Sequence, residues 1–316
     1  MNIGGSAMSD LKTPVLSEEV KESKFKRFMN RDNTVGYVFA SPFIIGFLGF
    51  TIIPMIVSFY YSFTDYNMIS DANWIGLGNY SRLFRDERFL NSVRVTLIYV
   101  FTSVPVKLIF ALFIAVLLTK KIRAVNFYRA LFYVPSLIGG SIAVALVWKE
   151  LFSRRGLINT IMIHIGLDPI SWFGDQRMAM IPLILISAWQ FGSSMIIFAA
   201  GLKDIPQSYY EASVIDGAGK IQQFFKITLP LLSPIVLFNL IMQTISAFMA
   251  FTQAFVITGG GPNDATNFYA LYVYDHAFTF HNMGYASAMS WIMLVVIGGI
   301  TFLIFKFSKY WTFYDR

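Results

Sequence analysis

Long uncharged stretches, separated by short polar segments, make up most of the chain. A helix that crosses a bilayer needs about 20 mostly apolar residues, and six stretches reach that length. Five of them contain no charged residue, and the second contains only Lys107. The predicted spans are residues 37–63, 95–119, 130–148, 180–202, 233–258 and 286–305. The pattern therefore predicts an all-α integral membrane protein with six transmembrane helices and both termini on one side.

The distribution of Lys and Arg indicates which side that is. The two terminal segments, together with those that follow the second and fourth spans, contain 16 of these residues, whereas the alternate segments contain 8. Cytoplasmic segments of membrane proteins carry the excess of positive charge. We therefore expect both termini in the cytoplasm, with a tail at 1–35, a membrane domain at 36–310 and a second tail at 311–316. Residues 1–7 are interpreted as a remnant of cloning.

The composition excludes several other classes of protein. Hydrophobic residues make up 56% of the chain, charged residues 14%, and the mean hydropathy is +0.58. Soluble proteins carry about 25% charged residues. The net charge of +7 is therefore assigned to the flanks of membrane spans and not to nucleic-acid binding. The chain has no cysteine, and its three histidines are scattered, so neither a disulfide framework nor a metal site is expected.

The chemistry of an enzyme is also missing from the sequence. No G-x-x-x-x-G-K-[ST] phosphate-binding loop occurs. The glycine-rich "TGGGPND" at residues 258–264 contains no lysine and is predicted to be an external turn. No Ser/His/Asp or Cys/His arrangement is recognisable. We therefore expect no catalytic residues and no cofactor on this chain.

One cytoplasmic segment, residues 203–230, has a different character from the rest. It contains "YYEASVIDGAGKIQQFFKITLP", which is polar, rich in small residues and closed by a proline. Pro206 is typical of a helix start, whereas Gly217 and Gly219 are typical of helix ends. The segment after Gly219 predicts a second short helix with Phe224 and Phe225 on its apolar face. An ordinary pair of helices at the membrane surface would also fit these features.

The spacing of this segment resembles the EAA loop of the membrane subunits of ATP-binding-cassette (ABC) importers. That loop has the form E-A-A-x-x-D-G-A, followed after a spacer by an aromatic residue and I-x-L-P. Ser213 replaces the second alanine. The matching positions are Glu211, Ala212, Ser213, Asp216, Gly217, Ala218, Phe225, Ile227, Leu229 and Pro230.

Other segments extend the resemblance over nearly the whole chain. "YVFASPFIIGFLGFTIIPMIVSFYYSFTDYN" is similar to the first span of bacterial carbohydrate-importer permeases, and "WIGLGNYSRLF" to their first external loop. "VITGGGPNDATNFYALYVYDHAF" and the terminal "YDR" resemble the first of the two non-identical permeases of such systems, the larger maltose-type permease. The resemblance implies a type I ABC importer fold in the bacterial cell membrane.

The resemblance also implies partners. They are a second permease, a dimer of ATPases that holds ATP and Mg²⁺, and an extracytoplasmic binding protein that delivers a sugar. The EAA loop would dock on an ATPase through Glu211, with small residues at 212 and 213 allowing close approach. From the residues themselves, we expect Asp216 to cap the second helix through its carboxylate. Burial of Tyr209, Tyr210 and Phe225 would supply most of the docking energy.

Polar and aromatic side chains within the spans are candidates for the substrate path, because polar groups in a bilayer are costly unless they have a function. Gln243, Ser246 and Ala250 are spaced to share one helix face. Ser and Thr that bond their own helix, or Gln that joins two helices, would give the same pattern. The candidates are Trp189, Gln190, Ser193, Gln243, Ser246, Phe248, Phe251, Gln253, Ser136 and Ser141.

Lys107 and the identity of the cargo leave alternatives open. Lys107 either faces a cavity or a partner carboxylate, or it extends along the helix to the outer surface, and we favour the structural interpretation. An oligosaccharide is the favoured cargo, with glycerol phosphate or an acidic sugar derivative as the alternative. A secondary transporter driven by ions is a rival class, but such carriers use acidic residues inside spans, and the six predicted spans contain none.

Overall fold

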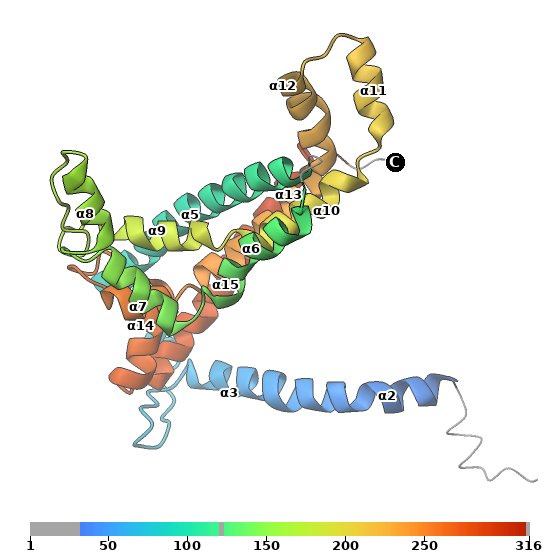
Figure 1. The fold of residues 1–316 in the computed structure, drawn as a ribbon. Helices are drawn as coiled ribbons and strands as arrows, with labels where there is room; N and C mark the ends of the chain where they lie inside the picture. The colour runs from blue at the N-terminus through green and yellow to red at the C-terminus, as the bar shows by residue number, and fades with distance from the viewer. Residues whose placement is uncertain (1–31, 120–122, 314–316) are drawn as a thin grey trace, which may run out of the picture. The chain divides into compact units, whose positions relative to one another are not determined.

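The computed structural model describes residues 32–119 and 123–313, and in these ranges the chain is helical, with no β-strand (Figure 1). A single isolated bridge joins Thr64 and Trp74. The chain divides into two compact units, Met1–Val57 and Ser58–Arg316, which are described separately. Most of the predicted N-terminal tail, Lys120, Lys121 and the terminal "YDR" lie outside the described residues.

The first unit contains most of one continuous helical run. It consists of α2 (Asp32–Phe47), the π-helical turn η1 (Leu48–Ile52) and α3 (Ile53–Tyr61), whose last turn belongs to the second unit. The π-helical turn ends two residues before Pro54, which has no backbone N–H to donate, so the regular hydrogen-bond ladder of the helix is interrupted here. The run agrees with the predicted span at residues 37–63 and ends two residues earlier.

In the second unit, α4 (Gly78–Leu83) precedes the longest helix, α5 (Glu87–Thr119). α5 has 33 residues, which corresponds to about 50 Å at a rise of 1.5 Å per residue. It begins eight residues before the predicted span at 95–119. The carboxylate of Asp86 explains this start, because its Oδ1 atom accepts hydrogen bonds from the backbone N–H groups of Arg88 and Phe89 at 3.0 and 3.1 Å.

The third and fourth predicted spans are each broken into two helices. α6 (Val125–Ile138) and α7 (Ile142–Leu151) meet at an angle of 98°, and α9 (Met180–Trp189) and α10 (Gly192–Asp204) meet at 43°. The predicted spans at 130–148 and 180–202 therefore each correspond to a bent pair of helices instead of one continuous helix. At the first break, the hydroxyl of Ser141 accepts a hydrogen bond from Val144 N at 3.3 Å and begins a new helix after two glycines.

The fifth predicted span also differs from the structure. α11 (Gln207–Ile215) is followed by α12 (Lys220–Gln223) and the π-helical turn η2 (Phe224–Thr228), which continues into α13 (Leu229–Phe248). α13 ends ten residues before the predicted end at 258, and the chain then leaves the helix before the π-helical turn η3 (Ala254–Thr258). Ala250 consequently lies outside the helix, so the predicted helical face of Gln243, Ser246 and Ala250 does not exist as such.

The remaining helices are α8 (Leu157–His164), α14 (Tyr269–Tyr274) with the π-helical turn η4 (Asp275–Thr279), and α15 (Met283–Ser308). Four helical runs in the described residues are long and apolar enough to span a membrane, or up to six if each bent pair counts as one span. This agrees with an all-α membrane protein.

The core of the second unit forms around α5, which packs against α9, α10 and α13. Small alanines on α5 let the neighbouring helices approach closely and exclude solvent. The fully buried side chains at these contacts include Ala111, Ala115, Leu183, Ile186, Met195 and Leu232.

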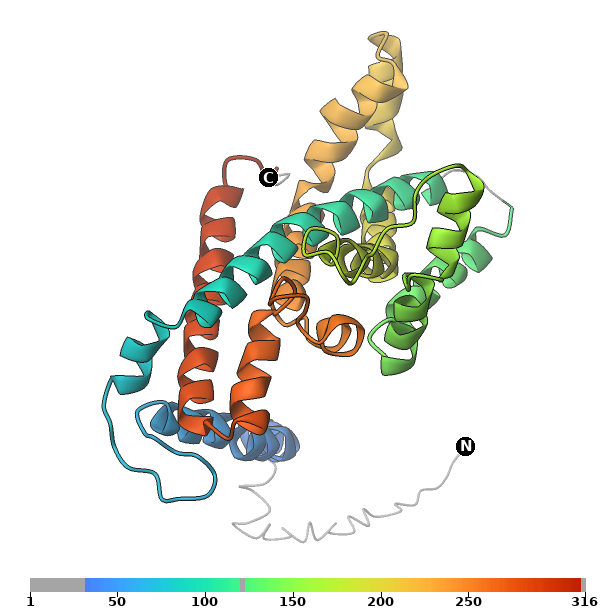
Figure 2. The ribbon, with the colours of Figure 1, turned by 90° about the vertical axis from the view of Figure 1, so that its left-hand side faces the viewer.

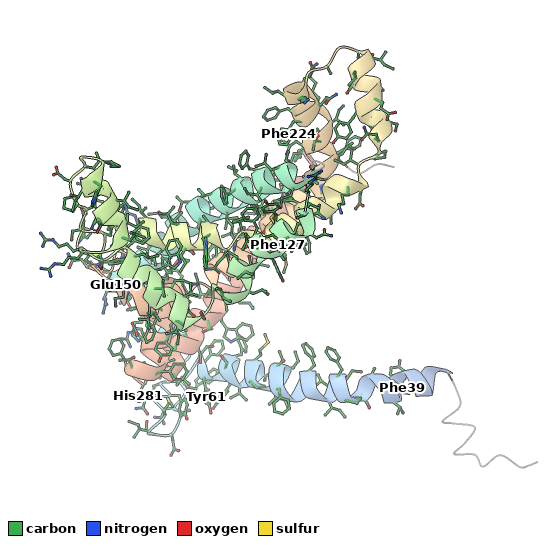
Figure 3. All side chains as sticks on the ribbon, viewed as in Figure 1. Phe39, Tyr61, Phe127, Glu150, Phe224 and His281 are labelled. Carbon is green, nitrogen blue, oxygen red and sulfur yellow. The ribbon has the colours of Figure 1, made fainter. Side chains whose placement is uncertain are left out.

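Connections gather at two opposite ends of this unit (Figures 1 and 2). α11, α12, Phe224 and the last described residues lie at one end, where Phe313 N donates to Ser233 Oγ at 2.8 Å. Glu150 and His281 lie at the other end (Figure 3). There, Gly284 N donates to Tyr66 O at 2.9 Å. The long helices α5, α13 and α15 therefore extend between these two ends.

Candidate functional site

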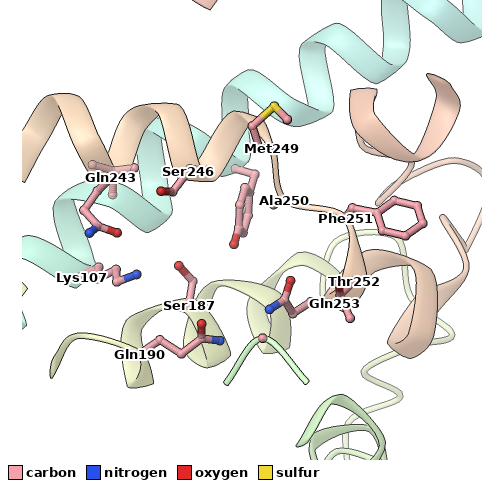
Figure 4. Close-up of a pocket in the computed structure, with 14 residues that line it drawn as sticks. Lys107, Ser187, Gln190, Gln243, Ser246, Met249, Ala250, Phe251, Thr252 and Gln253 are labelled. Atoms are coloured by element: carbon pink, nitrogen blue, oxygen red, sulfur yellow. The ribbon is translucent and has the colours of Figure 1, made fainter. Parts of the chain in front are cut away.

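A polar pocket of about 230 Å³ lies within the second unit, at the breaks in the third, fourth and fifth predicted spans (Figure 4). Its walls come from α5, from α9 and its end at Gln190, from the break after α6, and from α13 with the segment that follows it. The lining residues are Tyr99, Val104, Lys107, Gly140, Ser187, Gln190, Gln243, Ser246, Ala247, Met249, Ala250, Phe251, Thr252 and Gln253.

Two glutamines of the pocket are oriented by one backbone carbonyl. The side-chain Nε2 atoms of Gln190 and Gln253 donate to Gly139 O at 3.2 and 3.4 Å. Because the amide nitrogen of each side chain is directed at this carbonyl, each amide oxygen is left as an acceptor for another group. Gly139 is required for this contact, since a Cβ atom there would collide with Cγ and Cδ of Gln190.

Ser136 on α6 stabilises the break between α9 and α10. Its hydroxyl donates to Gln190 O at 3.0 Å and accepts a hydrogen bond from Ser193 N at 3.1 Å. These bonds satisfy backbone groups that the break between α9 and α10 would otherwise leave unpaired. Ser136 and Ser193 therefore position the pocket wall and do not line it.

Among the lining residues in the described part of the chain, Lys107 on α5 is the only Lys or Arg. Figure 4 shows its ammonium group between Gln243 on α13 and Ser187 and Gln190 at the end of α9. No Asp or Glu occurs among the pocket residues in the described part of the chain. The sequence-based preference for a structural lysine that extends to the outer surface was therefore wrong, and the cavity-facing alternative describes its position.

Half of the predicted path residues meet in this pocket: Gln190, Gln243, Ser246, Phe251 and Gln253. The other half do not line it. Besides Ser136 and Ser193, Ser141 caps α7, and Phe248 is 4% exposed in the core. Trp189 stacks at a tilt on Trp148, with ring centroids 5.8 Å apart.

The sequence analysis missed five residues that line the pocket: Tyr99, Val104, Gly140, Ala247 and Met249. A signal for the α5 wall was available, because Tyr99, Ser103 and Lys107 recur every fourth residue and so share a helix face. Met249 had no such signal, since its position follows from the end of α13 at Phe248.

The predicted helix–turn–helix at residues 203–230 is present. α11 ends at Ile215, and Gly217 adopts a left-handed conformation with φ of +76°. Ala218 N donates to Ser213 O at 2.9 Å and Gly217 N to Val214 O at 3.0 Å, which is the Schellman arrangement at a helix C-terminus. Glycine fits this conformation without the strain that a Cβ atom would cause.

Two predictions in this segment were wrong. Gly219 does not end a helix but begins α12 as its N-cap, and that cap has no side-chain hydrogen bond. Asp216 therefore does not cap the second helix and instead lies at the C-terminal end of α11. The turn is closed by the backbone bonds of the Schellman arrangement, so a capping carboxylate is not needed there.

Side chains tie α11 to the segment that follows it. The Ser213 hydroxyl donates to Tyr210 O at 2.7 Å and accepts a hydrogen bond from Gln223 Nε2 at 2.8 Å. The hydroxyl groups of Tyr210 and Thr228 are 2.9 Å apart. Ser213, the departure from the alanine of the motif, thus provides a bridge that alanine could not make.

The outer surface of this helix pair remains apolar and open. Ile215, Ile221 and Phe225 are 87, 77 and 61% exposed, and Glu211 is also exposed. Next to them, a groove of about 980 Å³ runs between α11, η2 and the ends of α5 and α10. Tyr209 and Phe225 are not buried within this chain, so any burial of these rings requires another surface.

A second polar cluster, at the end where Glu150 and His281 lie, joins α5 to α14 and α15. The Asp86 carboxylate accepts hydrogen bonds from the hydroxyls of Tyr272 and Tyr285 at 2.8 and 2.7 Å. Burial acts to raise the pKa of Asp86, but the hydrogen bonds from the two tyrosines and from the backbone outweigh it and leave the pKa below its ordinary value.

His276 is buried beside this cluster. Its ring packs edge-on against Tyr272, Tyr285 and Phe280, with centroids 4.7 to 5.3 Å apart. Burial, reinforced by the positive charge of Arg82, lowers the pKa of His276 to about 4. At neutral pH the histidine is therefore uncharged.

The glycine-rich loop after η3 is fixed to the start of α5. Arg88 forms a bidentate pair with Asp264, at 2.9 Å from Nε and 2.8 Å from Nη2. Asn91 Nδ2 donates to the backbone oxygen of Asp264 at 3.0 Å. As predicted, the loop forms a turn, and these contacts hold it over the helix.

The comparisons with known proteins agree with this architecture. Residues 74–310 match the family described as "Binding-protein-dependent transport system inner membrane component". The chain is 52% identical over 296 residues to the probable ABC transporter permease protein YesP of Bacillus subtilis, covering 92% of this chain and 96% of YesP. It is 32% identical over 286 residues to the trehalose/maltose transport system permease protein MalF of Thermococcus litoralis, covering 89% and 95% of the two chains.

A solved structure has the same fold. It is a chain of a bacterial ABC transporter involved in the import of the acidic polysaccharide alginate, with a TM-score of 0.78 and 22% identity over 91% of this chain and 99% of the other. Together with the long apolar helices and the family match over most of the sequence, this establishes a multi-pass membrane protein. The chain therefore belongs to the family of inner membrane components of binding-protein-dependent transport systems, the permeases of ABC transporters.

Proposed function

We propose that this permease forms half of the path by which an ATP-driven importer carries an oligosaccharide into a bacterial cell. The observation that carries the proposal is the polar pocket at the three broken spans. Sugar hydroxyls need both donors and acceptors, and the pocket offers the amide oxygens of Gln190 and Gln253 with the hydroxyls of Ser187 and Ser246. Phe251 adds an aromatic surface beside them.

The size of the pocket supports a substrate site that is shared with a second permease. Its volume of about 230 Å³ is smaller than the roughly 300–1,000 Å³ of pockets that enclose a small ligand. A second, non-identical permease would supply the opposite wall. MalF of Thermococcus litoralis, by its name a trehalose/maltose permease, is similar over 89% of this chain, which favours a sugar as cargo.

The proposed topology has six spans of the type I importer, with the third and fourth bent and both termini cytoplasmic. The excess of Lys and Arg in the alternate segments supports this orientation. The broken spans support a transport role, because irregular backbone within a membrane is tolerated where it lines a cavity. The extracytoplasmic binding protein would deliver its sugar at the end where Arg82, Glu150 and His281 lie.

We further propose that the helix pair α11–α12 couples this chain to a dimer of ATPases, which bind ATP and Mg²⁺. The exposed apolar side chains of Ile215, Ile221 and Phe225 would insert into a groove on the ATPase, since such a patch favours contact with a partner. Glu211 would pair with a basic or hydroxyl group there. Its exposed position means that shape and apolar burial contribute more than charge.

Glu211→Lys in the assembled four-subunit complex tests the coupling role. Stimulation of ATP hydrolysis by the sugar-loaded binding protein should be lost, while assembly and basal hydrolysis persist. Glu211→Gln removes the charge but keeps the size of the side chain, and it should retain most of the stimulation because shape and apolar burial contribute more than charge. If Glu211→Lys retains full stimulation and transport in an intact complex, Glu211 has no docking role.

A further inference from the structure

The pocket combines one cation with an otherwise uncharged lining. Lys107 contributes an ammonium group, and the remaining thirteen lining residues include neither Asp, Glu nor Arg. The twelve described carboxylate side chains all belong to residues outside the lining, and the ion pair found among the described residues, Arg88–Asp264, joins α5 to the loop at residues 259–267. Nothing within the described pocket therefore neutralises Lys107.

An ammonium group in such a place is costly. Polar and ionisable groups at membrane depth are expensive and mark sites with a function. The cost falls when an anion enters, because the attraction between opposite charges is stronger in a cavity of low dielectric constant than in water. A neutral sugar would not provide this compensation.

The pocket groups around Lys107 offer hydrogen-bond donors and acceptors that suit an anionic saccharide. Gln190 and Gln253 use their amide nitrogens on Gly139 O, so they present oxygen atoms, which suit hydroxyl groups. The donors left for an anion include the Lys107 ammonium, the side-chain amide of Gln243 and nearby hydroxyls such as those of Ser187 and Ser246. The pocket thus offers acceptors for the hydroxyl groups of a sugar ring together with donors for an anionic substituent.

We propose that the cargo is a saccharide with an anionic group, a carboxylate or a phosphate, and that Lys107 binds this group during passage. The inference rests on the proposed transport function and specifies its substrate class. Lysine acts on such a group as a point charge, so both anions fit. Lys107 is in this account a specificity-determining residue of the path.

The test uses the complete complex with its binding protein in proteoliposomes. The panel contains di- to tetrasaccharides of uronic acids, the same compounds as neutral methyl esters, sugar phosphates and glycerol 3-phosphate. ATP-dependent uptake of each is measured for the original chain and for Lys107→Met, Lys107→Gln and Lys107→Arg. Arg94→Met is the matched control, because it removes a cation from an exposed position of the same helix outside the pocket.

We expect the original chain to take up an anionic saccharide. Lys107→Met and Lys107→Gln should lower the uptake of the anionic form relative to the ester about 10-fold to 100-fold, the range for loss of a charged hydrogen bond. Lys107→Arg and Arg94→Met should preserve the preference. Using both neutral variants keeps the test decisive if one of them fails to assemble.

Several results would overturn the inference. One is an unchanged ratio of anionic to ester uptake in both neutral variants, and another is an equal loss of acid and ester uptake. A third is transport of neutral saccharides alone, which would leave the proposed transport function intact. An equal loss would indicate that Lys107 pairs with a carboxylate of the second permease. Uptake of glycerol 3-phosphate alone would keep the anion site but reject the oligosaccharide. Uptake of no sugar at all would reject the proposed function itself.

Discussion

The side-chain amide of Gln190 donates to the carbonyl oxygen of Gly139 at 3.2 Å, across the break between α6 and α7. This contact joins the two bent spans at the pocket. It depends on the missing side chain of Gly139, because a Cβ atom there would occupy the space of Gln190 Cγ and Cδ. The pocket wall and the break in the helix are therefore one structural feature.

Gly139→Ala should displace Gln190 and with it the amide oxygen that faces the pocket. We expect uptake to fall about 10-fold or more, in line with the loss of one to two oriented hydrogen bonds, while the complex still assembles. Substrate uptake in proteoliposomes is the measurement. Gly298→Ala adds the same methyl group in open space on α15 and should leave uptake near its original level. Equal uptake by both variants would contradict this role of Gly139.

Asn159 should stabilise the loop that contains α8. It is fully buried, its Nδ2 atom donates to the carbonyls of Ser153, Arg154 and Ile170, and its Oδ1 atom accepts from Ile170 N and Trp172 Nε1. Asn159→Ala removes these hydrogen bonds and leaves their backbone and Trp172 partners unpaired, which should cost about 2–4 kcal/mol of local stability. Hydrogen exchange of residues 153–172 measures it. Thr160→Ala, at an exposed neighbour that bonds only its own helix, should cause little change.

His276 should make the stability of the cluster around Asp86, Tyr272 and Tyr285 depend on pH. Its pKa is about 4 in the folded chain, whereas the ordinary pKa of a histidine side chain, which applies to the unfolded chain, is 6.5. Between these values the unfolded state binds more protons, so stability falls as the pH drops from about 6.5 to 4. The lowered pKa of Asp86 reduces folding stability only below its ordinary value of 3.8. The raised pKa of Asp275 increases folding stability as the pH drops, and so it opposes the effect of His276.

His276→Phe isolates this contribution, since it keeps an aromatic ring against Tyr272 and Tyr285 but removes the titrating group. Thermal unfolding of the complex at pH 4.5, 5.5 and 7 should show a smaller loss at acid pH in the variant than in the original chain. The neighbouring charges Arg82, Arg88 and Asp275 are unchanged in both proteins. If the unfolding temperature falls equally with pH in the variant and the original chain, the buried neutral histidine is not the source of the pH dependence.

The Arg88–Asp264 pair should couple the glycine-rich loop only weakly to α5. Its side chains are 56 and 32% exposed, and exposed pairs contribute about 0.2–1 kcal/mol. A double-mutant cycle with Arg88→Met and Asp264→Asn measures this coupling through thermal unfolding. A coupling well above 1 kcal/mol would show that the pair is shielded from water in the assembled complex.

Much of the fold was predictable because long uncharged stretches have few structural solutions in a membrane. Five of the ten predicted path residues line the pocket, and four of these five are polar, because polar side chains in membrane spans collect around a cavity. The bends within the predicted spans could not be predicted from the sequence. Hydropathy measures composition over a window, so it registered residues 130–148 as one apolar run although Gly139, Gly140 and Ser141 turn it by 98°.

The misassigned residues have physical explanations as well. Asp216 was predicted as a cap because its side chain favours that position, but the turn is closed by backbone bonds from Gly217 and Ala218. Lys107 had two possible directions along its helix, and only the placement of α9 and α13 around it decides between them. Tertiary contacts of this kind are not encoded in local spacing.

The most direct test of the account is uptake of sugar into proteoliposomes that contain the four-subunit complex, with binding protein on one side and ATP on the other. We predict accumulation that requires both the binding protein and ATP, without any proton or sodium gradient. Accumulation driven by such a gradient in the absence of ATP would contradict the account and identify the chain as part of a secondary transporter.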